Sequence, residues 1–527
     1  MPETDPSPPR SKFWILLITS LVSSLIMLDS NIVAVALPAI GRSFRASFEQ
    51  IEWIVTAYLL SYAALLLAAG AYADLRGRRK AMLLGLIIFA ASSAGCGLAP
   101  STLVLNIARA VQGVGGSLLL TAALAIITNT FIGVERARAF AVWGACLGVA
   151  LTAGPIVGGA ITNWFGWRWV FLVNVPACII LMIATIVVIK ESRDPDSRRL
   201  DILGIVTFSP GLFLLVWGLI EGNDAGWTSA AIVLRLAGAL LFFGLFIVAE
   251  RRQLRPMVDL SLFARSTFLG SVFAMLGYGA AAQVMVFYLP LFLQNAYGFH
   301  PAQAGLAMLP FAIPMVLAPR VTSKLATRIS GRDLLAVGLA ITCAGNLLFW
   351  LLSRPNVPYV LFVGSMLTTG AGAGILNGET VKVLGGAVPP ERAGMASGLA
   401  STTRFIGILV GVAGLGAVLS HLARHAFVQA AISLGLTADQ AMAISRHVVS
   451  GDLNDAISNS NGMTQHQLLA AGRAAFADGF SAAGLLAAFT AGVACALTLR
   501  FVRQVDTAPI GLPREVHCKT IDCRNPI

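Results

Sequence analysis

The feature that most limits the fold of this chain is a series of long apolar stretches. Each has about 20 mostly apolar residues, the length that an α-helix needs to cross the hydrocarbon core of a bilayer. Only 12% of the residues are charged, about half the share of an average soluble domain. The sequence therefore predicts an all-α integral membrane protein with fourteen transmembrane helices. We place them at 13–40, 51–72, 81–99, 103–130, 137–161, 169–189, 202–220, 229–249, 267–292, 302–319, 333–353, 358–380, 393–418 and 480–500.

Basic residues indicate which helix ends face the cytoplasm, because Lys and Arg gather on cytoplasmic loops. If the N-terminus is cytoplasmic and the spans alternate, most of the 37 basic residues fall on inner segments, four of them within 76–80. A missed or extra span would disrupt this alternation. We therefore expect both termini to be cytoplasmic, in a plasma or inner membrane. The formal charge of +12 then reflects sidedness, and we expect no nucleic-acid partner.

Two charged segments, 190–201 and 250–266, divide the spans into groups, with only two spans between them. The sequence thus predicts six spans, a two-span insert and six further spans. One long outer segment, 420–478, is expected to be a cap or a solvated loop with short surface helices. The expected units are an N-terminal six-helix bundle at 1–190, a linker with the inserted spans at 191–266, a C-terminal six-helix bundle at 267–503 and a cytoplasmic tail at 504–527.

The sequence lacks several chemical signatures of enzymes. No Gly-Lys pair occurs, so the phosphate-binding loop GxxxxGK[ST] is absent. The six histidines fall in predicted loops or in the tail, whereas a histidine-bound catalytic metal would lie within or beside the spans. We therefore expect no enzymatic activity, no metal and no cofactor, and transport becomes the leading class of function.

Asp29 is an ionisable residue inside the first span, and such residues are costly enough in a membrane to mark function. It lies roughly 24 Å above Phe13 at about 1.5 Å per residue, in the outer half of the bilayer. Arg109, in the fourth span, lies roughly 9 Å below the outer edge, which is a similar depth. A proton can take the place of Arg109 as the positive partner of Asp29, as a proton-coupled switch requires. The alternative is a fixed ion pair that only holds two helices together.

Charged residues also occur in or beside two later spans. Glu379 and Lys382 lie three residues apart on one helix face near the inner end of the twelfth span. A solvated pair at a helix end is the simpler interpretation there. Arg404 lies deeper, in the thirteenth span, and either extends to the interface or faces a cavity.

Glycines form a cluster in the fifth span, GACLGVALTAGPIVGG (144–159), which contains Gly154, Pro155, Gly158 and Gly159. Small residues four apart allow helices to pack closely, and a proline inside a helix kinks it. This span therefore either packs tightly or seals one side of a moving interface.

A second cluster, GAYADLRGRRK (70–80), joins the second and third spans on the predicted cytoplasmic side. Gly70 and Gly77 allow a tight turn. Asp74 can pair with Arg78 or cap a neighbouring helix. The spacing of these residues is more specific than the charge of the loop.

These motifs resemble those of the major facilitator superfamily, and within it the fourteen-span drug:proton antiporters. GAYADLRGRRK resembles the signature loop between spans 2 and 3, and LNIARAVQGVGG (105–116) resembles the span 4 motif, with Arg109 and Gln112. AGPIVGG (153–159) resembles the antiporter motif of span 5, although the family's upstream glycine is Ala150 here. Further similar segments are LDSNIVAVALP (28–38), WRWVFLVNVP (167–176), 288–310 and 388–407.

The resemblance implies two six-helix bundles that rock around a central cavity between inward- and outward-open states. Asp29 and Arg109 would then couple protons, and the loop with Asp74 and Arg78 would latch the cytoplasmic side. The span 5 motif would favour export by limiting leak. The candidate cavity residues are Gln112, Phe287, Tyr288, Gln294, Glu379 and Arg404.

The expected function is export of lipophilic, often cationic, small molecules in exchange for protons, driven by the proton gradient. The chain would act as a monomer in the lipid bilayer. The alternative on the same fold is a dedicated exporter of one endogenous metabolite or natural product. A non-transporting membrane sensor or scaffold is a third class, which the paired Asp29 and Arg109 disfavour. The first two classes stay open, because specificity depends on the shape of the cavity.

Overall fold

A computed structural model describes residues 9–193, 201–253, 258–354, 357–388, 393–450, 453, 457 and 462–507. The predicted tail at 504–527 thus lies outside the described residues from 508 onward. The regular elements of the described part are helices. Those before residue 260 are α1 (Pro9–Phe44), α2 (Phe48–Arg76), α3 (Arg78–Gly97), α4 (Thr102–Thr130), α5 (Gly133–Trp164), α6 (Arg168–Leu172), α7 (Asn174–Val188), α8 (Ile202–Ala225) and α9 (Ala230–Arg252).

The second half of the chain is also helical. Its elements are η1 (Leu260–Ala264), α10 (Ser266–Gly277), η2 (Tyr278–Gln283), α11 (Met285–Asn295), α12 (Pro301–Ala307), α13 (Leu309–Leu325), α14 (Gly331–Leu352), α15 (Tyr359–Gly386), α16 (Ala393–Ser433), α17 (Ala438–Ser450), α19 (Gly462–Phe501) and η4 (Val505–Thr507). Within the described residues, fourteen helical segments are long and apolar enough to cross a membrane. The predicted all-α membrane fold is therefore confirmed.

Polar residues at the ends of the spans fix where these helices begin. Ser47 caps α2, where its hydroxyl accepts a hydrogen bond from the Gln50 amide and the Gln50 side chain bonds back to the Ser47 amide. Such a capping box satisfies two amide groups that the helix leaves without partners. Four further helices, α4, α8, α9 and α14, begin with a single side-chain cap. The oxygens that accept the backbone N–H there belong, in the same order, to Ser101, Asp201, Ser229 and Ser330.

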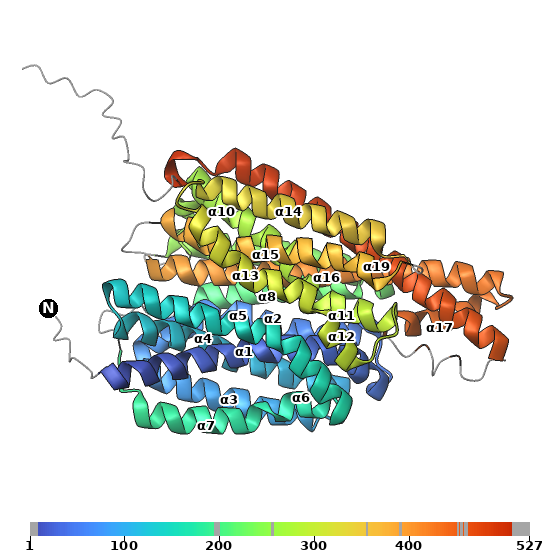
Figure 1. The fold of residues 1–527 in the computed structure, drawn as a ribbon, viewed down its shortest axis with the longest axis horizontal. Helices are drawn as coiled ribbons and strands as arrows, with labels where there is room; N and C mark the ends of the chain where they lie inside the picture. Colours follow the sequence, from blue (N-terminus) through green and yellow to red (C-terminus); the bar gives the residue numbers. More distant parts are fainter. Residues whose placement is uncertain are drawn as a thin grey trace, which may run out of the picture.

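The helices lie side by side in two groups (Figure 1). In the first group α1 packs on α4 and α5, and α3 packs on α4 and α7. In the second, α14 packs on α15 and α19, and α16 packs on α19. The chain begins α1 and ends α19 at the same end of the molecule, which we call the termini end; the opposite end is the distal end. The two groups meet where α5 packs on α12, α1 on α11 and α2 on α16.

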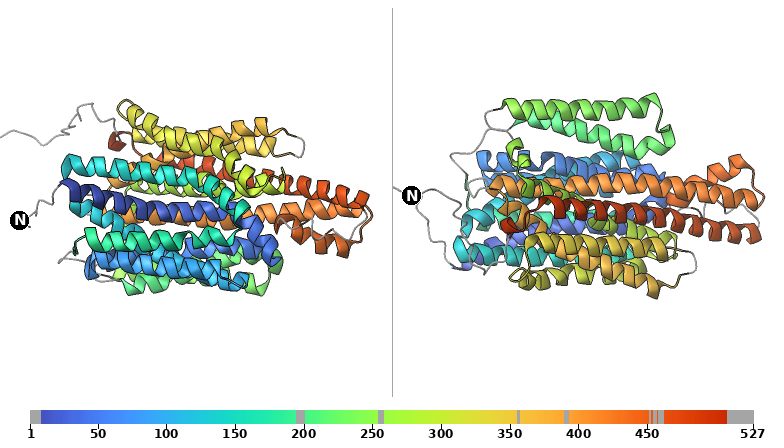
Figure 2. Two further views of the ribbon diagram at one scale, coloured as in Figure 1. Left: turned by 60° about the horizontal axis from the view of Figure 1, so that its bottom comes forward. Right: turned by 90° about the horizontal axis from the view of Figure 1, so that it is seen from above.

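The helices α8 and α9 form a pair on the outside of the molecule, which Figure 2 shows in green. They pack on each other, and α8 also contacts α2 of the first group and α16 of the second. The Asn223 side chain of α8 donates a hydrogen bond to the Ala417 carbonyl of α16, at 2.6 Å. The pair therefore covers the seam between the two groups.

The segment 420–478, for which we expected a cap or a solvated loop with short surface helices, is helical and not a loop over most of its described residues. Helix α16 continues unbroken to Ser433, and α19 begins at Gly462 and continues into the last span. Together with α17 these extensions project at the distal end (Figure 2). Ala-rich, polar sequence favours helix in water as well as in lipid, so the end of the apolar stretch does not mark the end of the helix.

Candidate functional site

The pair Asp29 and Arg109 forms the most deeply buried charged site of the described chain. Arg109 Nη1 of α4 donates to Asp29 Oδ2 of α1 at 2.7 Å, and both side chains are at most 1% exposed. The same guanidinium donates through Nε to the Ile54 carbonyl at 3.0 Å. This distance confirms the predicted proximity of the two charges. The prediction was possible because the rise per residue fixes the depth of each residue along its helix.

Amide side chains complete this site. Gln112 Nε2 donates to Asp29 Oδ1 at 3.0 Å and to the Ser93 hydroxyl at 2.8 Å, while Gln112 Oε1 accepts from Arg109 at 2.6 Å. Asn174, the first residue of α7, donates to the same Asp29 oxygen at 2.7 Å. A buried ion pair is tolerated when further hydrogen bonds satisfy its polar atoms. Gln112 was predicted as a cavity residue, but its side chain belongs to this network.

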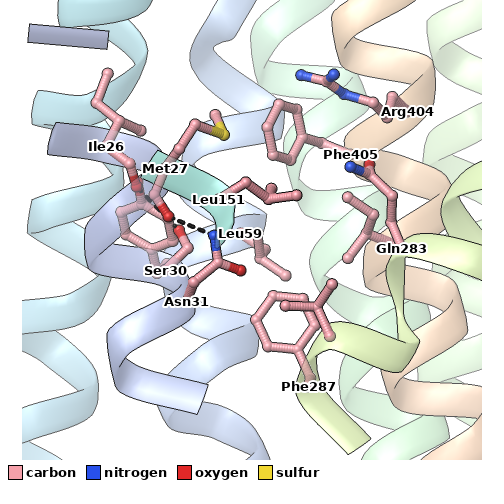
Figure 3. A pocket seen from close by; sticks show the side chains of 13 residues that line it. Ile26, Met27, Ser30, Asn31, Leu59, Leu151, Gln283, Phe287, Arg404 and Phe405 are labelled. Atoms are coloured by element: carbon pink, nitrogen blue, oxygen red, sulfur yellow. Dashed lines mark hydrogen bonds between the residues drawn. The ribbon is translucent and has the colours of Figure 1, made fainter. Parts of the chain in front are cut away.

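A central cavity lies between the two groups of helices (Figure 3). Its volume is about 40 Å³, enough for a few water molecules and far below the several hundred Å³ of a typical ligand site. Met27, Ser30 and Asn31 approach from α1, and Gln283, Phe287 and Arg404 approach from the opposite side. The lining residues are Ile26, Met27, Ser30, Asn31, Tyr58, Leu59, Leu151, Gln283, Val286, Phe287, Arg404, Phe405 and Ile408.

Tyr58 connects the cavity with the buried ion pair. Its ring lines the cavity, and the guanidinium carbon of Arg109 lies 4.2 Å from the ring centroid. Neither Asp29 nor Arg109 lines the cavity itself. Tyr58 therefore contacts the ion pair and also belongs to the cavity lining.

A π-helical turn, η2, brings one polar side chain, Gln283, to the cavity. Such turns are rare and frequently occur at functional sites. Gln283 ends this turn, and its Oε1 is buried without a hydrogen-bond partner among the described residues. Glycines let η2 and α16 approach closely, because a Cβ at Gly279 would lie 2.6 Å from the Arg404 carbonyl and one at Gly411 2.8 Å from Ala280. Sequence reasoning missed Gln283, although a glutamine inside an apolar span is a readable signal.

Of the three residues predicted for the ninth span, one lines the cavity. Phe287 does, whereas Tyr288 and Gln294 do not. The Tyr288 hydroxyl donates to the Val412 carbonyl at 2.5 Å, and Gln294 Nε2 donates to the Val35 carbonyl at 2.9 Å. Both side chains thus form contacts with α16 and α1, outside the lining of this small cavity.

Glu379 lies away from the central cavity. It is buried, accepts a hydrogen bond from Lys382 Nζ at 3.2 Å, and lines a separate cavity of about 320 Å³ between α13 and α15. The predicted pair is thus present, and Glu379 lines this second cavity instead of the central one. Arg404 lines the central cavity, as one of its two predicted positions required.

The loop between α2 and α3 has the predicted ion pair, with Arg78 Nη2 and Asp74 Oδ1 at 3.0 Å. Gly77 has a φ of 113°, which only glycine adopts readily. Gly70 lies inside α2 and packs near Thr121, so its predicted part in the turn is wrong. Glu191, which sequence reasoning missed, accepts hydrogen bonds from the amides of Arg79 and Lys80 at the start of α3.

The glycines of α5 lie where other helices come closest. A Cβ at Gly154 would stand 2.5 Å from Asn31 Cβ, and one at Gly158 2.8 Å from Ile32 Cα, so both allow α5 to pack on α1. A Cβ at Gly159 would stand 2.4 Å from the Pro301 carbonyl oxygen of α12. Gly305 of α12 lies directly against Pro155 of α5, since a Cβ at Gly305 would stand 2.2 Å from the Pro155 carbonyl oxygen. This segment therefore packs closely both on α1 of its own group and on α12 of the other group.

Sequence reasoning also missed a charged cluster at the distal end. Arg424 of α16 forms ion pairs with Glu49 of α2 and with Asp224 of α8, the latter at 2.5 Å. Glu52, one turn further along α2, is buried with an oxygen 3.4 Å from the Tyr288 hydroxyl. Glu52 falls inside the predicted span at 51–72, so an acidic residue in an apolar stretch was the available signal.

Comparisons of the sequence and of the fold with known proteins show which family this chain is similar to. The family model for the Major Facilitator Superfamily matches residues 19–412 and 267–505. The multidrug resistance protein Stp of Mycobacterium tuberculosis is 36% identical over 412 residues, 78% of this chain and 76% of Stp. The multidrug efflux pump LfrA of Mycolicibacterium smegmatis is 32% identical over 498 residues, 94% of this chain and 97% of LfrA. An inward-facing bacterial homolog of the human lysosomal transporter Spinster has the same fold, with a TM-score of 0.65, 16% identity, and coverage of 95% of this chain and 99% of that one.

Proposed function

This chain belongs to the major facilitator superfamily, and from that premise we propose that it exports lipophilic drugs or toxins in exchange for protons. The names of the relatives, a multidrug resistance protein and a multidrug efflux pump, support drug export. The chain is an integral multi-pass membrane protein. The proposal adds that the termini end is cytoplasmic, that the transporter works as a monomer, and that it carries out no enzymatic reaction.

The observation that carries the proton coupling is the buried pair of Asp29 and Arg109. A buried carboxylate requires a positive partner, so Asp29 can separate from Arg109 only if another cation replaces it. A proton is the smallest such cation, and Tyr58 both lines the cavity and contacts Arg109. A guest that displaces Tyr58 would move Arg109 and favour proton uptake at Asp29, which links the two events.

Alternating access would move the bundle at 1–190 against the bundle at 267–503, with the inserted spans at 191–266 along the seam. The distal contacts between them support a state that is closed on the outside. They include Gln294 with Val35 and the approach of Gly159 to Pro301. The pair of Asp74 and Arg78 would latch the cytoplasmic side when the transporter opens outward.

The test is a transport assay in inverted membrane vesicles, with a dye that follows the pH gradient and a panel of lipophilic compounds. Asp29→Asn keeps the shape of the side chain and removes its capacity to take up a proton. We expect the wild type to release protons when a substrate is added and Asp29→Asn to release none. Glu221→Gln is the matched control, because Glu221 pairs with Arg235 at 2.7 Å between α8 and α9, outside the central cavity.

Two results would contradict the proposal. If Asp29→Asn still moves protons, Asp29 is structural and the buried Glu52 becomes the next candidate for coupling. If no compound moves protons in vesicles that hold folded wild-type protein, broad drug export is wrong. A dedicated exporter of one metabolite would then fit the fold better.

A further inference from the structure

The charge of the central cavity restricts what it can hold. Among the described residues that line it, Arg404 is the one that carries a formal charge at neutral pH. The others are apolar, aromatic or neutral polar side chains. In the described part of the chain, no Asp or Glu lines the cavity to receive a cation.

Arg404 has no hydrogen bond or ion pair with any described residue, and its Nε is buried without a partner. Its guanidinium carbon lies 5.0 Å from the centroid of the neighbouring Phe405 ring. Asp29 does not serve as a partner, because Arg109, Gln112 and Asn174 already occupy its oxygens. A guanidinium has five N–H donors, so Arg404 has unused donors at the cavity.

Partly buried, unpaired cations are unfavourable, and a second positive charge brought near one adds repulsion. An anionic oxygen instead forms charge-assisted hydrogen bonds, which are the stronger class. A guest with a negative group therefore binds more tightly beside Arg404, whereas a cationic guest binds less tightly there. This charge preference is opposite to the cationic substrates that the family resemblance implies.

The rest of the cavity suits an apolar body beside that negative group. Phe287 and Phe405 offer aromatic faces, and Met27 offers a flexible apolar side chain from α1 (Figure 3). Gln283 contributes a buried oxygen without a partner, which can accept from a hydroxyl or amide of the guest. Polar groups stand on both sides of the cavity, with Ser30 and Asn31 on the α1 side and Gln283 and Arg404 on the η2 and α16 side.

We propose that the central cavity selects guests with an anionic oxygen group, a carboxylate or a phenolate, on an aromatic body, and that Arg404 binds that group. The proposal rests on the export function above, since it names the substrate class of the same site. The cavity of about 40 Å³ is too small for such a guest. The two bundles must separate before it enters, and Arg404 would then meet the guest from α16.

The experiment compares two probes that share a ring system and differ in charge. Anthracene-9-carboxylate and anthracen-9-ylmethylammonium are titrated into the purified full-length protein in detergent at neutral pH, with binding read from their fluorescence. The variants are Arg404→Gln and Arg404→Lys. Lys382→Gln is the matched control, because Lys382 is a cation of the separate cavity beside Glu379.

We expect the wild type to bind the carboxylate about tenfold or more tightly than the ammonium probe, as charge-assisted hydrogen bonds imply. Arg404→Gln should remove that preference by weakening the carboxylate alone, Arg404→Lys should keep part of it, and Lys382→Gln should keep all of it. The preference in the wild type is a test even if Arg404→Gln fails to fold.

Equal or tighter binding of the ammonium probe by the wild type would overturn the proposal. So would a preference that survives in folded Arg404→Gln, or one that Lys382→Gln removes, because the anion would then bind elsewhere. If neither probe binds, the proposal is also wrong. Proton-driven export still stands in each of these cases if other compounds release protons in the vesicle assay through Asp29.

Discussion

The distal ion-pair cluster should control how readily the transporter opens on that side. Arg424 of α16 bridges Glu49 of α2 and Asp224 of α8, so one guanidinium joins both bundles and the inserted helix pair. The side chains of Arg424 and Glu49 are 14% and 8% exposed, and that of Asp224 is 43% exposed. Arg424→Gln removes the bridge and leaves Glu49 buried beside a neutral residue.

The magnitude follows from these exposures. Removing one partner of a buried ion pair costs about 3–5 kcal/mol, whereas an exposed pair contributes about 0–1 kcal/mol. The Glu49 contact is close to the buried limit and the Asp224 contact is close to the exposed one. Since Glu49 is slightly accessible, we expect the closed state to lose about 2–3 kcal/mol relative to the open state. That corresponds to a change of about 30- to 150-fold in their ratio.

The assay measures the distance between spin labels on the two bundles at the distal end. Phe165 at the end of α5 and Leu306 in α12 are both exposed, and α5 packs on α12. In a cysteine-free background with labels at these positions, Arg424→Gln should increase a longer-distance population. Arg235→Gln is the control, because it breaks an ion pair of 2.7 Å within the α8 and α9 pair and none between the bundles.

A distance distribution that is unchanged in Arg424→Gln would refute the reasoning. The double variant Glu49→Gln with Arg424→Gln gives a second test of the electrostatic cause. It removes the carboxylate that Arg424→Gln alone leaves without a cation at position 49, so the distal end should close again in part. If it opens as far as Arg424→Gln alone, the loss of packing and not of charge explains the effect.

Two glycine substitutions test close approaches. Gly159→Ala should also increase the longer-distance population, because its Cβ would stand 2.4 Å from the Pro301 carbonyl oxygen, a backbone atom that moves only with α12. Gly414→Ala, which meets nothing within 4 Å, should leave the distances unchanged. Gly77→Ala should lower stability by about 1–3 kcal/mol, since φ is 113° and the Cβ would stand 2.5 Å from Glu191. Thermal unfolding in detergent measures this loss of stability. If the Tm of Gly77→Ala equals that of Gly414→Ala, the added Cβ causes no strain at Gly77.

The spans and the buried ion pair were predictable because both depend on local properties of the sequence. An apolar stretch sets the length of a membrane helix, and the rise per residue sets the depth of Asp29 and Arg109 along it. The partners Gln112 and Asn174 were not predicted as partners. Their contacts depend on which helix faces which, and Asn174 lies 145 residues from Asp29.

Helix rotation, which the sequence does not give directly, decides which residues line the small cavity. Phe287 and Tyr288 are neighbours, yet about 100° of rotation separates their side chains on a helix. One lines the cavity and the other bonds to Val412. The π-turn at 278–283 changes this rotation within the span. The cluster around Arg424 was equally hidden, because Glu49 lies 375 residues away in the sequence.

The two charged centres together have a consequence for the energy source. If Arg404 binds an anionic guest and Asp29 takes the proton, each export cycle moves a negative charge out and a positive charge in. Both movements follow an inside-negative potential, which contributes about 2.3 kcal/mol per charge per 100 mV. The cycle would thus gain about 4.6 kcal/mol per 100 mV, whereas exchange of a monovalent cation for one proton would gain none. Removing the potential while keeping the pH gradient should therefore slow export of anthracene-9-carboxylate and leave that of a cationic guest unchanged; equal effects on both would show that the two charges do not move in this way.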